Sequence, residues 1–267
     1  MLEFILIFVA AGCAAGFMAG LLGIGGGFVI VPVLVWVLPL TGMPTSQVPH
    51  FAIGTSLLCI CVTAIFSARA HHRRQAVDWP LFKLMVPALI VGSLSGSALA
   101  AVLSGKWLIA IFVMGALATA FYLLSGHQSK GQVDESKWPY LGYSFFTGGV
   151  SALIGIGGGS VLVPYLVYKG KPIVKAVGTA AASGIPIALF GAAGYGIAGV
   201  NAELTTDYAT GYLYWPAFLG IVIFSSLCAP LGVKLAHKLP PRRLRQAFAA
   251  FMFFTSGHIL YSQWLRN

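Results

Sequence analysis

Charged residues are scarce in this sequence, and their scarcity excludes an ordinary soluble domain. They make up 8% of the chain, and hydrophobic residues make up 58%, whereas a soluble globular domain is roughly a quarter charged. Long apolar blocks cover residues 2–40, 51–68, 79–103, 107–124, 138–168, 176–198, 212–235 and 244–264. Because about 20 apolar residues cross a bilayer as a helix, we expect an all-α, polytopic membrane protein.

Acidic residues are the rarest charged group, and none lies well inside an apolar block. All six are at block ends or in loops: Glu3, Asp78, Asp134, Glu135, Glu203 and Asp207. A transmembrane proton relay usually uses Asp, Glu or His within the bilayer, and only His258 lies well within a block. The sequence therefore indicates no enzyme and no resident cofactor or metal. Coupling to a proton, or to sodium held by backbone carbonyls, stays open.

The chain has only four cysteines, and they do not indicate a disulfide framework. Cys13, Cys59, Cys61 and Cys228 all lie in apolar blocks. Cys59 and Cys61 are two residues apart and would face different sides of a helix. Free cysteine is among the most buried residue types, so we expect packing residues rather than a metal site or a redox pair.

Glycine is abundant, and one glycine motif occurs twice. Gly23-Ile24-Gly25-Gly26-Gly27 precedes Val31-Pro32, and Gly155-Ile156-Gly157-Gly158-Gly159 precedes Val163-Pro164. Three successive glycines and a nearby proline interrupt a helix. Interrupted backbone at membrane depth is tolerated only where protein buries it or where it lines a wet cavity. Matching interruptions in two halves of a chain are typical of a transporter's binding site.

Further matched features extend this repeat over the whole chain. Gly54-Thr55 matches Gly178-Thr179, and Trp79-Pro80 matches Trp215-Pro216. We therefore predict two repeats joined by a cytoplasmic linker at 125–137. The first, 1–124, has a hairpin at 2–40 and helices at 51–68, 79–103 and 107–124; the second, 138–267, has a hairpin at 138–168 and helices at 176–198, 212–235 and 244–264.

The positive charges indicate that the two repeats are inverted. Lys and Arg are enriched in cytoplasmic loops, and the basic segment 69–74 corresponds to 199–211, which has no Lys or Arg. Placing 69–74 and 169–175 inside the cell makes each broken block a hairpin and gives about ten membrane segments. All 16 basic residues except Lys106 and Arg266 are then cytoplasmic. Both termini are predicted to be periplasmic, and the net charge reflects this topology and needs no nucleic-acid partner.

Each hairpin would bring the start of a short helix toward the middle of the bilayer. The first amides of a helix have no intrahelical partner, and the helix dipole favours an anion there. Glycine leaves these donors uncovered, and nearby hydroxyl groups can add further donors. The candidate substrate-binding residues are Gly25, Gly26, Gly27, Thr55, Ser56, Gly157, Gly158, Gly159, Ser160, Thr179 and Ser183. Two structural alternatives stay open: the glycines permit close helix packing, and the hydroxyls bond to carbonyls of their own helix.

The matched segments resemble one known family over nearly the whole chain. The resemblance is carried by Gly20–Leu34, Ala152–Leu166, Gly54-Thr55-Ser56, Gly178-Thr179, Val77-Asp78-Trp79 and Tyr214-Trp215. These segments resemble the TauE/SafE sulfite exporter family (TSUP, DUF81). The resemblance implies transport of small sulfur-containing oxyanions, such as sulfite and organosulfonates, with the glycine motifs at the core of the site. The second half departs from the first at Ala180, which stands where the first half has Ser56.

Residue pattern and resemblance together predict a secondary transporter in the bacterial inner membrane that exports a small sulfur-containing anion by alternating exposure of a midplane site. Its partners would be the oxyanion substrate and membrane lipids. One alternative is uptake of thiosulfate or another reduced sulfur compound through cysteine relays. A second alternative is a membrane assembly subunit that moves no solute. The identity of the anion, the coupling ion and the oligomeric state do not follow from the sequence.

Overall fold

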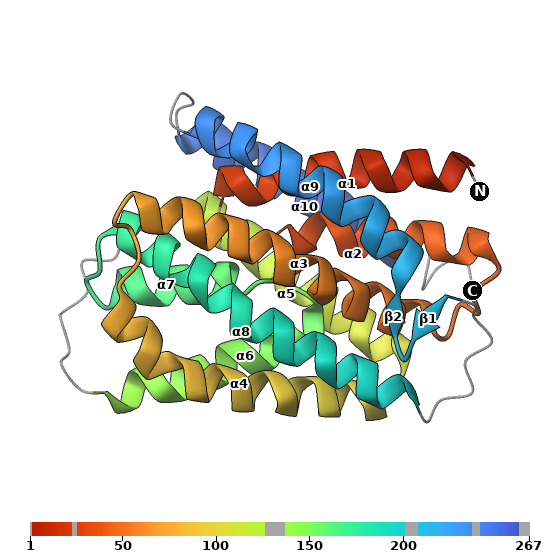
Figure 1. Ribbon diagram of the computed structural model, residues 1–267, viewed down its shortest axis with the longest axis horizontal. Coiled ribbons are helices and arrows are strands. Elements are labelled where there is room, and N and C mark those ends of the chain that lie inside the picture. Colours follow the sequence, from red (N-terminus) through yellow and green to blue (C-terminus); the bar gives the residue numbers. More distant parts are fainter. Residues whose placement is uncertain (1, 23–25, 126–136, 201–207, 237–240, 262–267) are drawn as a thin grey trace.

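The expected all-α class is confirmed by a computed structural model, which describes residues 2–22, 26–125, 137–200, 208–236 and 241–261. Figure 1 shows a bundle of long helices with one small sheet at its edge. The first half contains α1 (Leu2–Leu22), α2 (Gly27–Val37), a 3-10 turn (Leu38–Thr41), α3 (Val48–Arg73), α4 (Trp79–Val102) and α5 (Gly105–Ser125). The second half contains α6 (Trp138–Ile154), α7 (Gly159–Tyr168), α8 (Ile173–Val200), α9 (Trp215–Ala236) and α10 (Pro241–Leu260).

Five of these helices are long and apolar enough to cross a membrane, so the chain is a multi-pass membrane protein. They are α3, α4, α5, α8 and α9. In α3 and α8, 67% and 61% of the apolar window is buried inside the protein, against 33% in α5 and α9. The paired helices α3 and α8 therefore form the centre of the bundle. The outer helices expose large apolar side chains to lipid, such as Phe121 and Leu227.

Both glycine motifs interrupt helices, as the sequence predicts. Gly26 precedes α2 with φ +77°, and Gly158 precedes α7 with φ +66°. Gly155, at φ +70°, ends α6. Positive φ values strongly favour glycine, and the two prolines Pro32 and Pro164 lie within the short helices that follow. We call the segments between α1 and α2 and between α6 and α7 the first break and the second break.

The connections between helices gather at two opposite ends of the bundle (Figure 1). At one end, the Lys171 Nζ lies 2.9 Å from Asp78 Oδ2, and the Lys175 Nζ donates to the Gln75 carbonyl at 2.7 Å. These contacts join the α3–α4 and α7–α8 connections, and we call this the basic end. The first turn of α1 lies toward the opposite end, which also carries the small sheet and which we call the terminal end (Figure 1). The predicted topology requires this arrangement, while the cytoplasmic location of the basic end stays a prediction.

Several contacts recur at matched positions of the two halves. The Thr55 hydroxyl accepts a hydrogen bond from the Tyr214 N–H at 3.0 Å, and the Thr179 hydroxyl accepts one from the Asp78 N–H at 2.9 Å. A Cβ added at Gly54 would collide with the Tyr212 carbonyl oxygen, and one at Gly178 would collide with that of Ala76. Each half thus uses the same pair of residues to fasten a connection of the other half. Such recurrence is what duplicated halves would produce, and inversion of the two remains a prediction.

Several helix boundaries differ by a few residues from those that hydropathy gives, and at two helices the cause is clear. The helix expected at 212–235 begins at Trp215, because Leu213–Tyr214 forms strand β2 and pairs with strand β1 (Ala209–Thr210) around Gly211 at φ +55°. An apolar dipeptide in a strand cannot be distinguished by hydropathy from the start of a helix. The helix expected at 51–68 is longer at both ends and spans Val48–Arg73, because Pro49 fits a first helical turn and basic side chains suit a helix C-terminus.

Candidate functional site

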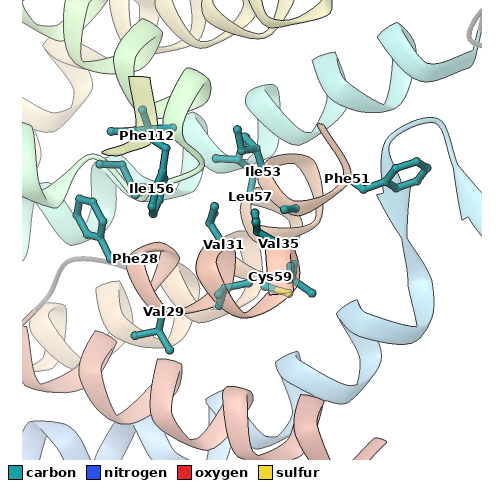
Figure 2. Packing of buried hydrophobic residues seen from close by; sticks show 14 of the residues in the cluster. Phe28, Val29, Val31, Val35, Phe51, Ile53, Leu57, Cys59, Phe112 and Ile156 are labelled. Atoms are coloured by element: carbon teal, nitrogen blue, oxygen red, sulfur yellow. The ribbon is translucent and has the colours of Figure 1, made fainter. Parts of the chain in front are cut away.

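Backbone contacts and apolar packing surround Gly27 and Phe28, the first residues of α2. A Cβ added at Gly27 would collide with the Gly155 carbonyl oxygen and would lie 3.0 Å from Ile156 Cα. Phe28 is 2% exposed, and its ring centroid lies 6.0 Å from that of Phe112. Figure 2 shows Phe28, Phe112 and Ile156 gathered in this apolar cluster. Gly27 therefore permits two chain segments to approach closely, which is the packing alternative that the sequence left open.

Gly25 and Gly26 are the other two glycines of this run. Gly25 lies outside the described residues. Gly26 is buried, and its carbonyl accepts hydrogen bonds from the Val29 and Ile30 amides at 2.9 and 3.1 Å, which closes the first turn of α2. The described glycines here, Gly26 and Gly27, thus serve the first turn of α2 and its packing against the second break.

The second break is a compact turn with all its glycines buried. The Gly159 amide donates to the Gly157 carbonyl at 2.7 Å, so it is already satisfied within the turn. The Gly158 carbonyl accepts from the Val161 and Leu162 amides at 3.2 and 2.8 Å and starts α7. A helix directs its earliest amides and the positive end of its dipole toward such a turn. Such an orientation would favour negative charge at the second break, and binding of the substrate there stays a prediction.

Of the four predicted hydroxyl groups of α3 and α8, three bond to other segments and one bonds to its own helix. Thr55 and Thr179 accept backbone N–H groups from the opposite half, as described above. The Ser56 hydroxyl donates to the Gly155 carbonyl at 2.8 Å and fastens α3 to the second break. The Ser183 hydroxyl donates to the Thr179 carbonyl of its own helix at 2.9 Å. Only Ser183 makes the intrahelical bond that was the structural alternative for all four.

A group of hydroxyls on α6 was not predicted. Ser144, Thr147 and Ser151 are each 0% exposed. Their hydroxyl oxygens, and that of the predicted Ser160 on α7, make no hydrogen bond within the described part of the chain. A Cβ added at Gly158 would lie 3.7 Å from Thr147 Cγ2 and 3.8 Å from Ser151 Oγ. Thr147 and Ser151 therefore face the second break. The sequence did offer one signal: Ser144, Thr147 and Ser151 are spaced so that they lie on one face of the helix that precedes the glycine run.

An acidic residue at the basic end joins three elements. The Asp78 carboxylate accepts from the Leu81 amide at 3.2 Å, which caps α4, and from the Lys171 ammonium at 2.9 Å. Partial burial raises the pKa of Asp78, but the hydrogen bonds from Lys171 and Leu81 and the charges of Lys171 and Lys175 outweigh it. The pKa of Asp78 therefore lies below its ordinary value, and the carboxylate stays ionised at neutral pH.

At the terminal end, the corresponding contacts are uncharged or aromatic. His50 Nε2 lies 3.1 Å from the carbonyl oxygens of Ala100 and Leu103, at the end of α4. The His50 ring also stacks on Tyr212, with centroids 4.8 Å apart. The basic end thus contains an ion pair, whereas the terminal end contains contacts of a histidine ring. Each end also has one of the two matched threonine hydrogen bonds.

Metal and thiol chemistry have little support in the described ranges. Those ranges contain no group of three or more His, Cys, Asp or Glu side chains arranged to hold a metal ion. Cys59 is packed among apolar side chains of α2 and α3 (Figure 2). Cys13 and Cys228 are within hydrogen-bonding reach of each other across α1 and α9. No disulfide joins any of the four cysteines, all of which are free thiols.

Comparison with known proteins identifies membrane transporters as relatives of this chain. A family model described as "Sulfite exporter TauE/SafE" matches residues 8–259. A probable membrane transporter protein of Haemophilus influenzae is 35% identical over 261 residues, which cover 94% of this chain and 96% of the relative. A probable membrane transporter protein of Methanocaldococcus jannaschii is 29% identical over 255 residues, covering 91% of each chain.

No solved structure matches this chain. The family match nonetheless spans both breaks and every described helix from α2 to α9, and the relatives are named as transporters rather than enzymes. The chain belongs to the TauE/SafE sulfite exporter family of membrane transporters.

Proposed function

We propose that this protein is a secondary transporter that exports a small sulfur-containing anion, such as sulfite or an organosulfonate, across the bacterial inner membrane. The observation that carries the proposal is the start of α7 at Gly158, a buried, neutral helix N-terminus faced by the buried side chains of Thr147 and Ser151. Helix N-termini favour anions, and hydroxyl groups can donate to the oxygens of an oxyanion. The family description names sulfite export.

Export of an anion can run on the membrane potential alone. Moving one elementary charge through 100 mV changes the free energy by about 2.3 kcal/mol, and an anion leaving a negative cytoplasm moves downhill. This mode needs no intramembrane carboxylate as a coupling site, in agreement with the placement of all six acidic residues at block ends or in loops. Sodium or proton coupling is the alternative to this uniport mode.

The two differently closed ends are compatible with alternating access. Opening the basic end would break the Lys171–Asp78 contact, and opening the terminal end would break the contacts of His50 with the end of α4. The recurring Thr55 and Thr179 bonds lie at these two ends. We take the described conformation to be one in which both ends are closed over the second break.

The proposal is tested by flux into proteoliposomes containing the purified protein. We expect saturable movement of labelled sulfite that an imposed potential drives toward the positive compartment, without a sodium or proton gradient. Sulfate, organosulfonates and thiosulfate in the same panel would define the substrate range. Absence of flux for every anion, under every imposed gradient, would contradict the proposal and favour a subunit that moves no solute.

The Cys13–Cys228 contact is the one observation that bears on the thiosulfate alternative. A relay of a reduced sulfur compound requires thiols, whereas an oxyanion site made of amides and hydroxyls does not. A variant in which all four cysteines are changed to Ala should keep its flux in the same assay. Loss of flux in a well-folded variant would favour the relay.

A further inference from the structure

We propose that the two breaks are not equivalent: the oxygens of the substrate bind only at the second break, to the hydroxyl groups of Thr147, Ser151 and Ser160. This inference rests on the proposed function and specifies where its substrate binds. The first break would then serve as a packed structural copy. Four independent observations lead to this assignment.

The first observation is that hydroxyl groups on membrane helices of this protein normally bond to their own helix. Ser93 donates to the Leu89 carbonyl at 2.7 Å, Thr119 to that of Gly115 at 2.8 Å, and Thr255 to that of Phe251 at 3.0 Å. This is the usual behaviour of Ser and Thr inside helices. Thr147 and Ser151 have the same choice on α6 and do not take it. Their hydroxyls therefore need a partner from outside the helix backbone.

The second observation is that these unpaired hydroxyls are buried. Thr147 and Ser151 are 0% exposed, and the Ser160 hydroxyl oxygen is also shielded. Buried polar atoms in native proteins nearly always have a hydrogen-bond partner, whether protein, water or ligand. Three unpaired hydroxyls around one turn therefore point to a bound polar species at that turn.

The third observation is that the Thr147 side chain and the Ser151 hydroxyl lie at the start of a helix. The distances of 3.7 and 3.8 Å from a Cβ added at Gly158 place the Thr147 and Ser151 side chains against that glycine. Ser160 lies in the first turn of α7, directly after Gly158 and Gly159. A side chain at Gly158 would occupy the space between Thr147 and Ser151. It would also come within 2.5 Å of Ile187 Cδ1, and glycine avoids these contacts at the start of the helix.

The fourth observation is that the first half lacks this donor set. When the two glycine motifs are aligned, Thr147, Ser151 and Ser160 correspond to Ala15, Ala19 and Phe28. None of these three has a hydroxyl group. Phe28 is buried against Phe112, and Gly27 is packed against the Gly155 carbonyl. The described residues that correspond to Gly159 and Ser160 are thus packed against other parts of the protein.

The donor set fits one class of ligand. Three neutral hydroxyls and the positive end of a helix dipole can each be directed at one oxygen of a small pyramidal or tetrahedral oxyanion. Sulfite and the head group of a sulfonate each offer three such oxygens. A site of this kind binds through hydrogen bonds alone, and an anion held without a fixed cation can also leave readily.

Isosteric variants test this assignment in the sulfite flux assay. Thr147→Val removes the hydroxyl and keeps the shape, Thr147→Ser keeps the hydroxyl, and Ser151→Ala and Ser160→Ala each remove one oxygen. The matched control is Thr119→Val, which removes a hydroxyl bonded to its own helix on α5. A hydrogen bond to a charged partner is worth enough that its loss should raise the KM for sulfite about tenfold or more. Thr147→Ser and Thr119→Val should keep the wild-type KM.

The outcomes separate this inference from the proposed function. If the wild-type protein transports sulfite and Thr147→Val, Ser151→Ala and Ser160→Ala all keep its KM, the hydroxyl assignment is overturned and the transport function stands. If the wild-type protein moves no oxyanion, the proposed function fails and this inference fails with it. Should Thr147→Val not fold, the two Ser→Ala variants decide the question. Sulfite-dependent thermal stabilisation in detergent, present in the control and lost in these variants, provides a second readout.

Discussion

Thr55 and Thr179 show how much a single matched residue can contribute to this molecule. Each lies on a central helix and accepts a hydrogen bond from a backbone N–H of the other half. The donor to Thr55 is Tyr214, at 3.0 Å, and the donor to Thr179 is Asp78, at 2.9 Å; each donor directly precedes a helix. The sequence predicted that these threonines matter, because Gly54-Thr55 and Gly178-Thr179 repeat. It could not give their partners, because Tyr214 and Asp78 lie far away in the chain. Their role toward substrate stays a prediction, whereas their role in joining the two halves is visible.

Asp78 gives a pH-dependent prediction at the residue scale. Its pKa is lowered from the ordinary value of 3.8, so its contribution to folding is fully present above that pH and is lost as the pH falls through the lowered pKa. Wild-type protein should therefore melt at a higher temperature than Asp78→Asn at neutral pH. The difference should shrink as the pH falls below about 4. Thermal melting in detergent at several pH values measures this difference, and a difference independent of pH would contradict the ion-pair account.

At the scale of elements, the glycine motifs predicted where helices break, and hydropathy predicted which segments are helical. The sequence could not show that the first break is closed, because the packing of Phe28 and Gly27 depends on residues from α5 and from the second break. It also could not show that Thr147 and Ser151 lack the intrahelical bonds that Ser93 and Thr119 make. Whether a buried Ser or Thr bonds to its own helix depends on the three-dimensional packing around it. Similar sequence patterns of Ser and Thr are found with and without that bond.

Close contact between α4 and α6 gives a prediction about helix packing. A Cβ added at Gly148 would collide with the Leu89 carbonyl oxygen, which belongs to the α4 backbone. We therefore expect Gly148→Ala to separate the two helices and to lower the amount of folded protein recovered from membranes. Gly142→Ala on the same helix is the control, because a Cβ there meets nothing within 4 Å. Equal recovery and equal melting temperatures for the two variants would show that α4 and α6 are less tightly packed than described.

For the whole molecule, the charge pattern predicted a topology with both termini on one side and two hairpins entering from opposite sides. The Lys171–Asp78 contact joins two connections that were assigned to the same side, while the inverted topology stays a prediction. Lys and Arg counts alone allowed this prediction, because loops of membrane proteins are sorted by charge. The side of the membrane on which each end lies is not fixed by packing.

Reporter fusions test that orientation. A fusion placed after Gln75, in the α3–α4 connection, should report the cytoplasm, and one placed after Tyr208, beside the small sheet, should report the periplasm. A pair of reporters active on opposite sides of the membrane, such as a fluorescent protein and a phosphatase, gives the readout at each position. The same compartment at both positions would overturn the inverted topology, and exchanged compartments would reverse the direction assigned to the positive charges.

The central claim is that the glycine turn before α7 binds the transported anion. Equilibrium binding of labelled sulfite to the purified protein tests it most directly, with Gly158→Leu compared with Gly142→Leu. A side chain at Gly158 would be strained at φ +66° and would place its Cβ 2.5 Å from Ile187 Cδ1, between Thr147 and Ser151. We predict that wild-type protein and Gly142→Leu bind sulfite saturably and that folded Gly158→Leu does not. Unchanged sulfite binding by folded Gly158→Leu would contradict the account.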